Sequence, residues 1–222
     1  MIHLLGQTKH LTAVAVSGGI DSMAALSFLR RSLEQAGETN KPSPAACNGQ
    51  KLKAIYFNHN TIHGVEAEKF VIDYCQSKNI QLILGKIITT RSTDLSWEEF
   101  WRIERYKFFS TLLEEKIVVA HHLNDVAETY IWSFIHGFPK IIPYFRKPNV
   151  YRPFLLTPKQ QLADWCRRKA VPHIEDPSNE DVSYTRNQIR HTLFPEVIRV
   201  NPGYLKTVAR ETRKKYATSL YG

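Results

Sequence analysis

The sequence predicts an α/β protein in which helices cover both faces of a parallel sheet. Apolar strand-like runs alternate with helical patterns over the first two thirds of the 222 residues. One β-branched run ends in a Ser-Gly-Gly turn, and an apolar helical pattern follows immediately. Hydrophobic residues make up 43% of the chain, which is enough for a sizeable core. Since ligands of such sheets bind at the carboxyl ends of the strands, this turn marks the expected site.

The expected strands cover residues 12–16, 52–57, 81–88 and 117–120. The helices expected between and after them cover residues 20–35, 64–78, 96–115 and 124–136. Residues 37–50 are rich in Pro, Ser, Asn and Gly, which predicts an exposed loop between the first helix and the second strand.

The last third of the chain has a different pattern. After Gly137 the sequence is punctuated by proline, and three helices are expected over residues 158–169, 184–197 and 202–216. Thr157 is the expected N-cap of the first of them, with Pro158 at its first helical position. We therefore expect a core over residues 1–140 and a helical C-terminal extension, residues 141–222, that caps the active site within the same domain.

The composition favours a polyanionic partner and a reducing compartment. The formal net charge is +9 and the sequence pI is about 9.5, although basic proteins without such a partner are also common. The chain has three cysteines, Cys47, Cys75 and Cys166, and no two of them form a Cys-x-x-Cys pair. This spacing argues against a disulfide framework and a zinc site. No apolar run has the length of a membrane span and no secretory signal opens the chain, so we expect a cytoplasmic protein.

A pyrophosphate cradle is predicted by the segment Ser17-Gly18-Gly19-Ile20-Asp21-Ser22. Its small residues form a turn whose backbone N–H groups can approach an anion closely, and the positive end of the next helix adds to this attraction. The Asp21 carboxylate would repel a phosphate unless a divalent cation lay between them. The segment is neither a Walker loop nor a dinucleotide fingerprint, and an ordinary Gly-containing turn is the alternative.

A second strand-to-helix junction carries His121, His122, Asn124 and Asp125, with Glu128 one turn later. Asp125 and Glu128 share one face of the expected helix, where two carboxylates could bind Mg²⁺ or a cationic substrate. The alternative is that Asn124 is only an N-cap and that the histidines serve packing and hydrogen bonding. Adjacent histidines do not have metal-ligand spacing, so no zinc site is expected.

Two basic patterns follow from helical spacing. Arg186 and Arg190 lie four residues apart on one helical face, which suits a carboxylate or phosphate ligand, with a solvated basic face as the ordinary alternative. Aromatic and basic residues alternate over 101–109, and their helical spacing favours core positions over a base-stacking platform.

The order of the motifs along the chain is more specific than any one of them. After the cradle come Asn58-His59, Glu104-Arg105-Tyr106, His-His-x-Asn-Asp-x-x-Glu-Thr, Tyr151-Arg152-Pro153-Phe154-Leu155, Asp176-Pro177-Ser178-Asn179 and Arg186-Asn187-Gln188-Ile189-Arg190. The cradle resembles the PP-loop of the N-type ATP pyrophosphatases, which implies a Rossmann-like sheet. Residues 11–195 as a whole resemble the N-terminal catalytic domain of the tRNA(Ile)-lysidine synthase family.

The resemblance implies a ligase that uses ATP and Mg²⁺ to adenylate the C2 oxygen of the wobble cytidine in a tRNA(Ile) with a CAU anticodon. Free L-lysine then attacks C2 and AMP leaves. A homodimer is also left open by the resemblance.

The resemblance also implies roles for individual residues. ATP would be bound by Ser17, Gly18, Gly19, Ile20, Asp21, Ser22 and His121, with Asp21 as the Mg²⁺ contact. Asp125 and Glu128 would hold the lysine substrate or metal, and Arg186 and Arg190 would hold phosphate or the lysine carboxylate. The expected catalytic residues among these are Asp21, Asp125, Glu128 and Arg190.

The sequence departs from the family pattern in four places. Asn124 stands where a first aspartate is usual, and residues 60–62 replace a Gly-Leu-Arg. A Gly-rich stretch after the Glu-Thr helix is shortened to residues 134–140. The chain stops at Gly222, so separate C-terminal tRNA-binding domains are not expected. The basic residues within 206–215 are candidates for replacing their phosphate contacts.

Two other functions remain open. A tRNA thiolation enzyme with the same loop would need cysteines for sulfur handling, which the three scattered cysteines disfavour. A non-catalytic tRNA-binding relative would bind RNA without tRNA-dependent ATP–pyrophosphate exchange.

Overall fold

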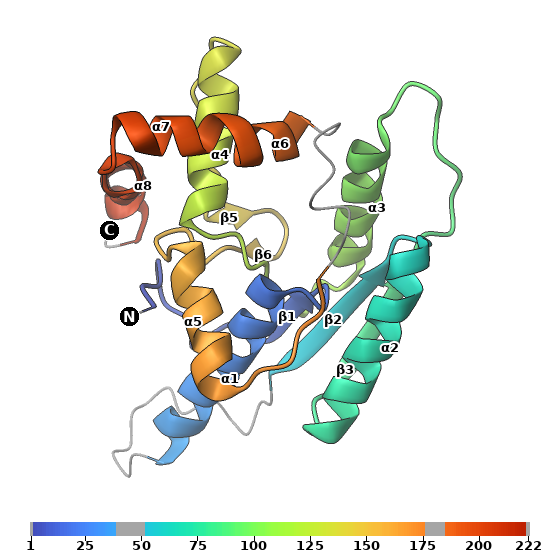
Figure 1. Cartoon of the computed structure of the whole chain (residues 1–222). Helices are drawn as coiled ribbons and strands as arrows, with labels where there is room; N and C mark the ends of the chain where they lie inside the picture. The colour runs from blue at the N-terminus through green and yellow to red at the C-terminus, as the bar shows by residue number, and fades with distance from the viewer. Residues whose placement is uncertain (1, 39–51, 176–184, 221–222) are drawn as a thin grey trace.

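The computed structural model describes residues 2–38, 52–175 and 185–220 (Figure 1). Most of the loop expected over 37–50, Cys47, and the 176–179 motif lie outside the described residues. The described strands are β1 (Ala13–Val16), β2 (Lys53–Asn58), β3 (Leu82–Lys86), β4 (Ile117–Val118), β5 (Phe145–Arg146) and β6 (Val150–Tyr151). They form a sheet of order β3-β2-β1-β4-β6-β5, in which only the β5–β6 pair is antiparallel.

The helices follow the predicted alternation with the strands. They are α1 (Ile20–Glu38), α2 (Ile62–Ser77), α3 (Trp97–Thr111), α4 (Leu123–Ile135), α5 (Lys159–Lys169), α6 (Thr185–Gln188), a π-helical turn η2 (Ile189–Leu193), α7 (Phe194–Val200) and α8 (Tyr204–Leu220). None of the described helices is both long and apolar enough to span a membrane.

Successive strand residues point to opposite faces of the sheet, and helices cover both faces. Val14 and Tyr56 are buried in a core that includes residues of α1, α2 and α5. Ile55 and Ile117 are buried on the other side with Phe109 of α3. This arrangement confirms the expected fold class, because strands buried on both faces require helices on both faces.

The sheet order creates a crevice beside β1. The chain runs outward from β1 to β2 and β3, then returns to β4 on the other side of β1. Connections therefore leave the carboxyl ends of β1 and β4 in opposite directions, and such a switch point is where open α/β sheets bind ligands. The loop Ser17–Ser22 follows β1, and the His121–Asp125 segment follows β4, so the topology brings both predicted motifs to this crevice.

The segment after α4 contributes two strands that the sequence did not predict. β6 pairs with β4 in the register Ile117↔Val150 and Val118↔Tyr151, so the sheet continues past residue 140. Strands of two residues leave no periodicity to detect, and this stretch is rich in proline. The buried Asn149 amide ties it to α3, since its Nδ2 donates to the carbonyls of Phe109 (2.9 Å) and Leu112 (2.7 Å).

Two of the expected helix caps are wrong. His122, not Asn124, is the N-cap of α4, and this helix begins at Leu123. Asn124 instead caps α5, because its Oδ1 accepts a hydrogen bond from the Lys159 N–H at 2.9 Å. Thr157 does not cap α5: its hydroxyl donates to the His3 carbonyl at 2.6 Å. Pro158, expected at the first helical position, is instead the N-cap residue of α5 and makes no side-chain cap hydrogen bond. The acceptor for the first N–H of α5 therefore comes from another helix, a contact that local sequence spacing cannot reveal.

The helix expected over 184–197 is broken by a π-helical turn; residue 184 is outside the described part. The Phe194 N–H donates to the carbonyl of Ile189, five residues earlier. Pro195 lies at the start of α7. Proline has no N–H and its ring clashes with the carbonyl four residues before it, so regular α-helical bonding cannot pass through this point. The wider turn includes Arg190.

We expect Asn149→Ala to lower the free energy of unfolding by about 1–3 kcal/mol, because two hydrogen bonds to the end of α3 are lost. Urea denaturation followed by circular dichroism measures this loss. Asn149→Asp is the matched variant, since it keeps the shape but removes the same donor, and it should be destabilised as well. A wild-type midpoint for both variants would contradict the tethering role.

Candidate active site

The turn after β1 requires glycine at position 18 for two reasons. Gly18 has φ +84°, a conformation that L side chains rarely adopt. The Ile174 N–H also donates to the Gly18 carbonyl at 3.0 Å, and a Cβ on Gly18 would lie 3.0 Å from the Ile174 side chain. Ile174, a few residues after the end of α5, is thus attached to this turn.

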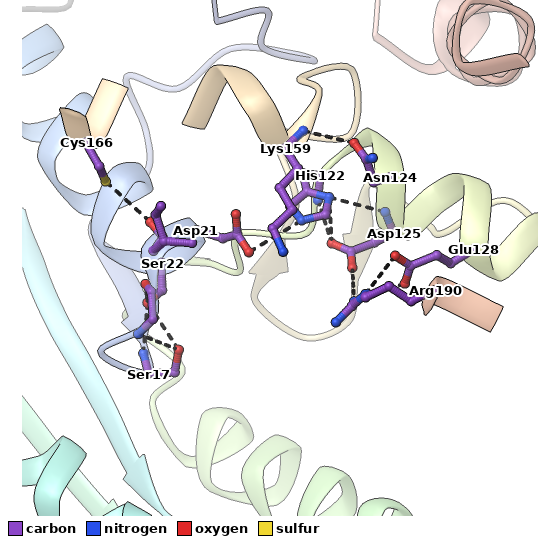
Figure 2. Close-up of polar contacts among 12 residues, drawn as sticks. Ser17, Asp21, Ser22, His122, Asn124, Asp125, Glu128, Lys159, Cys166 and Arg190 are labelled. Atoms are coloured by element: carbon purple, nitrogen blue, oxygen red, sulfur yellow. Dashed lines mark hydrogen bonds and ion pairs between the residues drawn. The ribbon is translucent and has the colours of Figure 1, made fainter. Parts of the chain in front are cut away.

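Hydroxyl groups hold the rest of the turn (Figure 2). The buried Ser22 Oγ accepts a hydrogen bond from the Ser17 N–H at 3.1 Å and donates to the Gly19 carbonyl at 2.9 Å. Ser17 Oγ accepts from the Gly19 N–H at 3.3 Å. Ile20 begins α1 and its side chain packs against the core, so only its backbone is placed to serve a ligand. The N–H groups of the first helical turn have no intrahelical acceptors, which makes this end attractive to an anion.

Asp21 presents a carboxylate oxygen that fits a cation. Its Oδ1 is buried and has no hydrogen-bond partner, while its Oδ2 lies 3.4 Å from Nε2 of His122. No group of three or more His, Cys, Asp or Glu side chains in the described ranges could hold a metal ion. A single carboxylate is nonetheless sufficient for Mg²⁺, which is usually bound by one or two carboxylates together with substrate phosphates and water.

His122 connects the two predicted motifs, a role that the sequence did not assign to it. The ring Nδ1 of His122 accepts a hydrogen bond from the backbone N–H of Asp125 at 3.2 Å. The backbone N–H of His122 donates in return to Asp125 Oδ2 at 2.9 Å, and the two bonds form a capping box. The other ring nitrogen faces Asp21 from the first motif. Figure 2 shows the imidazole between the two carboxylates. The His-His-x-Asn-Asp pattern was the available signal, but it does not tell which histidine points inward.

Burial and neighbouring charges shift the pKa values of His122 and Asp125 in opposite directions. Burial disfavours the imidazolium of His122, but the carboxylates of Asp125 and Asp21 outweigh it and raise its pKa. Burial likewise acts against the Asp125 carboxylate, yet His122 and Arg186 hold the pKa of Asp125 well below its usual range. Asp125 is therefore ionised inside the protein and depends on its cationic neighbours.

Two arginines from the far end of the chain pair with the two carboxylates of α4. Arg190 forms a bidentate pair with Glu128, with its Nε 2.9 Å from Oε1 and its Nη2 3.0 Å from Oε2. Arg186 Nη2 donates to Asp125 Oδ1 at 2.9 Å, and its Nε lies 3.7 Å from Glu128. Cross contacts of this kind join the four side chains into one network, which we call the ion-pair quartet (Asp125, Glu128, Arg186, Arg190).

His121 is held neutral by its surroundings. Arg152 is buried and donates from Nε to His121 Nδ1 at 3.0 Å, and from Nη2 to the Tyr106 hydroxyl at 2.8 Å. Burial and the nearby arginines, Arg152 first among them, lower the pKa of His121 to about 3, against the opposing pull of Asp125. With Nδ1 acting as an acceptor, the ring proton is on Nε2.

These residues surround a cavity of about 510 Å³, a size typical of small-molecule sites. Its lining includes Ser17, Asp21 and Ser22, then His121 and Asp125, and then Arg186, Asn187 and Arg190. The lining also includes His59, Trp101 and Arg105. The structure therefore brings most of the predicted residues to one cavity. Gly18, Gly19, Ile20 and Glu128 are not part of its lining, and Glu128 reaches the site through its ion pair with Arg190, which is part of it.

Arg105 is a cationic group whose place in the cavity sequence reasoning missed. It lines the cavity, and burial together with Arg102, Arg186 and Arg152 lowers its pKa, with Tyr106 acting in the opposite direction. In the described part of the chain no carboxylate forms an ion pair with it. A buried guanidinium surrounded by other cations favours an anionic ligand. Its motif, Glu104-Arg105-Tyr106, was visible in the sequence, but the motif does not indicate that the Arg105 side chain points into the cavity.

Comparison with known proteins agrees with this geometry. The PP-loop domain family model matches residues 2–197. The chain is 32% identical over 214 residues to a tRNA(Ile)-lysidine synthase of Lactiplantibacillus plantarum, covering 90% of this chain and 45% of that protein. It is 31% identical over 212 residues to the enzyme of the same name from Thermosipho africanus, covering 89% of this chain and 46% of that one. The chain thus spans about half the length of these relatives.

A solved structure supports the fold. A U34-tRNA thiolase from Methanococcus maripaludis, solved with its [4Fe-4S] cluster, superposes with a TM-score of 0.68. The match covers 91% of this chain and 71% of that one at 15% sequence identity. At this identity the likeness concerns the arrangement of helices and strands.

We expect the protein to lose stability as the pH falls from about 6.5 towards 3. An unfolded His121 binds a proton near its usual pKa of 6.5, whereas the folded form, with a pKa of about 3, does not, so protonation favours unfolding. This group alone contributes up to about 1.4 kcal/mol per pH unit at the steepest point. Denaturation midpoints measured across this range test the slope.

His121→Gln should make that slope shallower, because the amide oxygen can still accept from Arg152 but does not titrate. His136→Gln is the control, since it replaces an exposed histidine. An unchanged slope in His121→Gln would show that other groups account for the acid sensitivity.

Proposed function

This chain belongs to the PP-loop family, and we propose that it synthesises lysidine on tRNA. In the proposed reaction ATP adenylates the C2 oxygen of the wobble cytidine in a tRNA(Ile) with a CAU anticodon, and free lysine then displaces AMP. The observation that carries the proposal is that Ser17, Asp21 and Ser22 line one cavity with Asp125, Arg186 and Arg190 of the ion-pair quartet, whose fourth member, Glu128, pairs with Arg190 behind the lining. Relatives that match about 90% of the chain bear the name of this enzyme.

The proposed ATP site is the turn and the start of α1. Backbone N–H groups of the turn and the positive end of α1 would stabilise the charge that develops on the departing pyrophosphate. Asp21 Oδ1 would hold Mg²⁺, which supplies positive charge to the phosphates when bound. Neutral His121, with its proton on Nε2, would be a hydrogen-bond donor to the nucleotide rather than a charged group.

The ion-pair quartet is the proposed site of lysine. A free amino acid carries an ammonium and a carboxylate on one carbon, and the quartet offers two carboxylates and two guanidiniums side by side. Each charged group of the ligand can replace an ion pair that the quartet makes within itself. The roles expected for Asp125 and Glu128 towards a cation, and for Arg186 and Arg190 towards an anion, are thereby combined in one site.

The two cysteines within the described residues give no support to sulfur transfer. Cys75 and Cys166 are buried, and burial raises the pKa of each thiol to about 11. Their thiolate fraction near neutral pH is therefore small, whereas sulfur chemistry needs the thiolate. In this part of the chain their role is packing.

The cytoplasmic location and the homodimer stay predictions.

The exposed basic residues of α8 are a proposed tRNA contact. Val208, Ala209 and Tyr216 bury one face of α8 against α4 and its neighbours. Lys206 and Arg213 lie on the exposed surface, while Arg210 and Lys214 both pair with Glu211, which lowers the positive charge that this face offers. Binding through such residues would weaken steeply as salt rises.

The direct test is incubation of an unmodified tRNA(Ile) transcript with a CAU anticodon, ATP, Mg²⁺ and lysine, followed by mass spectrometry of its nucleosides. We expect one cytidine to gain the mass of lysine less water. Asp21→Asn should reduce product by more than about 100-fold while the circular dichroism spectrum is kept, because the carboxylate charge of the cation site is lost. No product from the wild type under ATP saturation would refute the proposed reaction.

Glu128→Gln tests the lysine site. Loss of one charge-assisted interaction, worth about 1.5–3 kcal/mol, should raise the KM for lysine about 10- to 150-fold with little change in the KM for ATP. Glu196→Gln is the matched control, since it breaks an exposed Glu–Arg pair on α7. If Glu128→Gln instead impairs tRNA-dependent ATP–pyrophosphate exchange and leaves the KM for lysine unchanged, Glu128 serves to position Arg190 for the phosphates.

A further inference from the structure

A row of neighbouring flat side chains, tilted relative to one another, leads away from the cavity; we call it the aromatic ladder (His59, Trp101, Trp97, Arg91). The ring centroids of His59 and Trp101 are 5.8 Å apart, with an interplanar angle of 39°. Trp101 and Trp97 are also 5.8 Å apart, at 35°. The guanidinium carbon of Arg91 lies over the Trp97 ring at 4.6 Å from its centroid. Each member therefore contacts the next through partly parallel faces.

The ladder reaches from the cavity to the surface. His59 and Trp101 line the cavity, whereas Trp97 lies outside that lining and is 52% exposed. Arg91 belongs to the long loop between β3 and α3, which projects beyond the sheet in Figure 1, and hydrogen bonds to the Leu95 and Ser92 carbonyls hold its guanidinium in place. The sequence pattern over 101–109 favoured core positions, and Phe109 is buried while Trp101 packs against a hydrophobic cluster. Both residues also line the cavity, which the pattern did not indicate.

The inner end of the ladder carries a polar atom without a partner. His59 Nδ1 is buried and makes no hydrogen bond. Burial, with a smaller contribution from Arg105, lowers the pKa of His59 to about 4, so the ring is neutral near pH 7. An unsatisfied ring nitrogen on a cavity wall is a group that a ligand can satisfy.

Positive charge flanks the ladder. Arg102 is exposed on the same helix, and Arg105 lines the cavity next to Trp101. Glu98 is the acidic residue that α3 contributes to the cavity lining, which also includes Asp21 and Asp125. Flat side chains combined with arginines are the usual surface for unstacked bases of single-stranded RNA, which stack on aromatic rings and on guanidinium planes while their phosphates meet cations.

We propose that the aromatic ladder stacks one or more bases of the RNA loop adjacent to the reacting nucleotide, with Trp97 and Arg91 as the outer platform. The inference rests on the proposed function, since it assumes an RNA loop that delivers a base to the cavity. Continuity of the ladder with the cavity favours RNA over a protein partner. The base needs no particular identity, because every base has a face that can stack.

The test measures the affinity of the full chain for an unmodified tRNA(Ile) transcript with a CAU anticodon, at several salt concentrations, for the wild type, Trp97→Ala and Trp97→Phe. Trp132→Ala is the matched control, since Trp132 is 43% exposed and stacks on His136, but lies on α4 outside the cavity lining. ATP affinity is measured in parallel, and thermal unfolding checks each variant.

We expect Trp97→Ala to weaken tRNA binding about 5- to 150-fold, the change that corresponds to about 1–3 kcal/mol for a stacked base, and Trp97→Phe to restore most of it. The slope of log affinity against log salt should stay the same, because no phosphate contact is removed. ATP affinity and the Trp132→Ala variant should match the wild type.

Other outcomes overturn the inference. Equal tRNA affinity in Trp97→Ala and Trp132→Ala would exclude a base platform. A loss of ATP affinity would assign the ladder to the adenine ring, and a changed oligomeric state would assign it to a protein contact. The two proposals can fail separately. If the wild type forms lysidine but Trp97→Ala binds tRNA as tightly as the wild type, only the ladder is refuted. If Trp97→Ala weakens tRNA binding but the wild type forms no lysidine, only the reaction is refuted. Absence of any tRNA binding by the wild type refutes both.

Discussion

The site depends on the balance of charge around Asp125. Three carboxylates, those of Asp21, Asp125 and Glu128, gather at the carboxyl ends of β1 and β4, and Asp125 and Glu128 are almost entirely buried. Burial acts against the charged form of Asp125, and the neighbouring His122 and Arg186 hold the pKa of this carboxyl well below its usual range, while Arg190 pairs with Glu128. The same balance makes the site suited to ligands that carry both charges, because such a ligand exchanges ion pairs without adding net charge.

The balance couples segments that are far apart along the chain. α4 supplies the carboxylates, the turn after β1 supplies Asp21, and the α6–η2 segment supplies the arginines. The π-helical turn next to Pro195 shapes the backbone that carries Arg190, and Ile174, after α5, is hydrogen-bonded to Gly18 of the turn. A change at any of these points would shift the cations relative to the carboxylates, so the C-terminal third takes part in the site rather than only covering it.

The lining of the cavity offers two kinds of chemistry, which match the two parts of the proposed reaction. The turn after β1, with Asp21 and the nearby ion pairs, offers backbone donors, a cation site and paired charges, all suited to phosphates and to an amino acid. Neutral His59 and Trp101 offer ring faces suited to a base, and the guanidinium of Arg105 suits an anion. A nucleotide of the RNA that enters along the aromatic ladder would therefore meet the activated phosphate in this cavity.

The sequence by itself determined the fold class, the alternation of helices and strands, and which polar residues follow β1 and β4, because periodicity and strand-to-helix turns are local properties. It also placed Asp125 with Glu128, and Arg186 with Arg190, on common helical faces. Only the tertiary structure decided that these pairs meet, that His122 links them to Asp21, and that Asn124 caps α5 instead of α4. It also decided that the two-residue strands β5 and β6 join the sheet. Each of these features depends on contacts between residues distant along the chain, which no local pattern encodes.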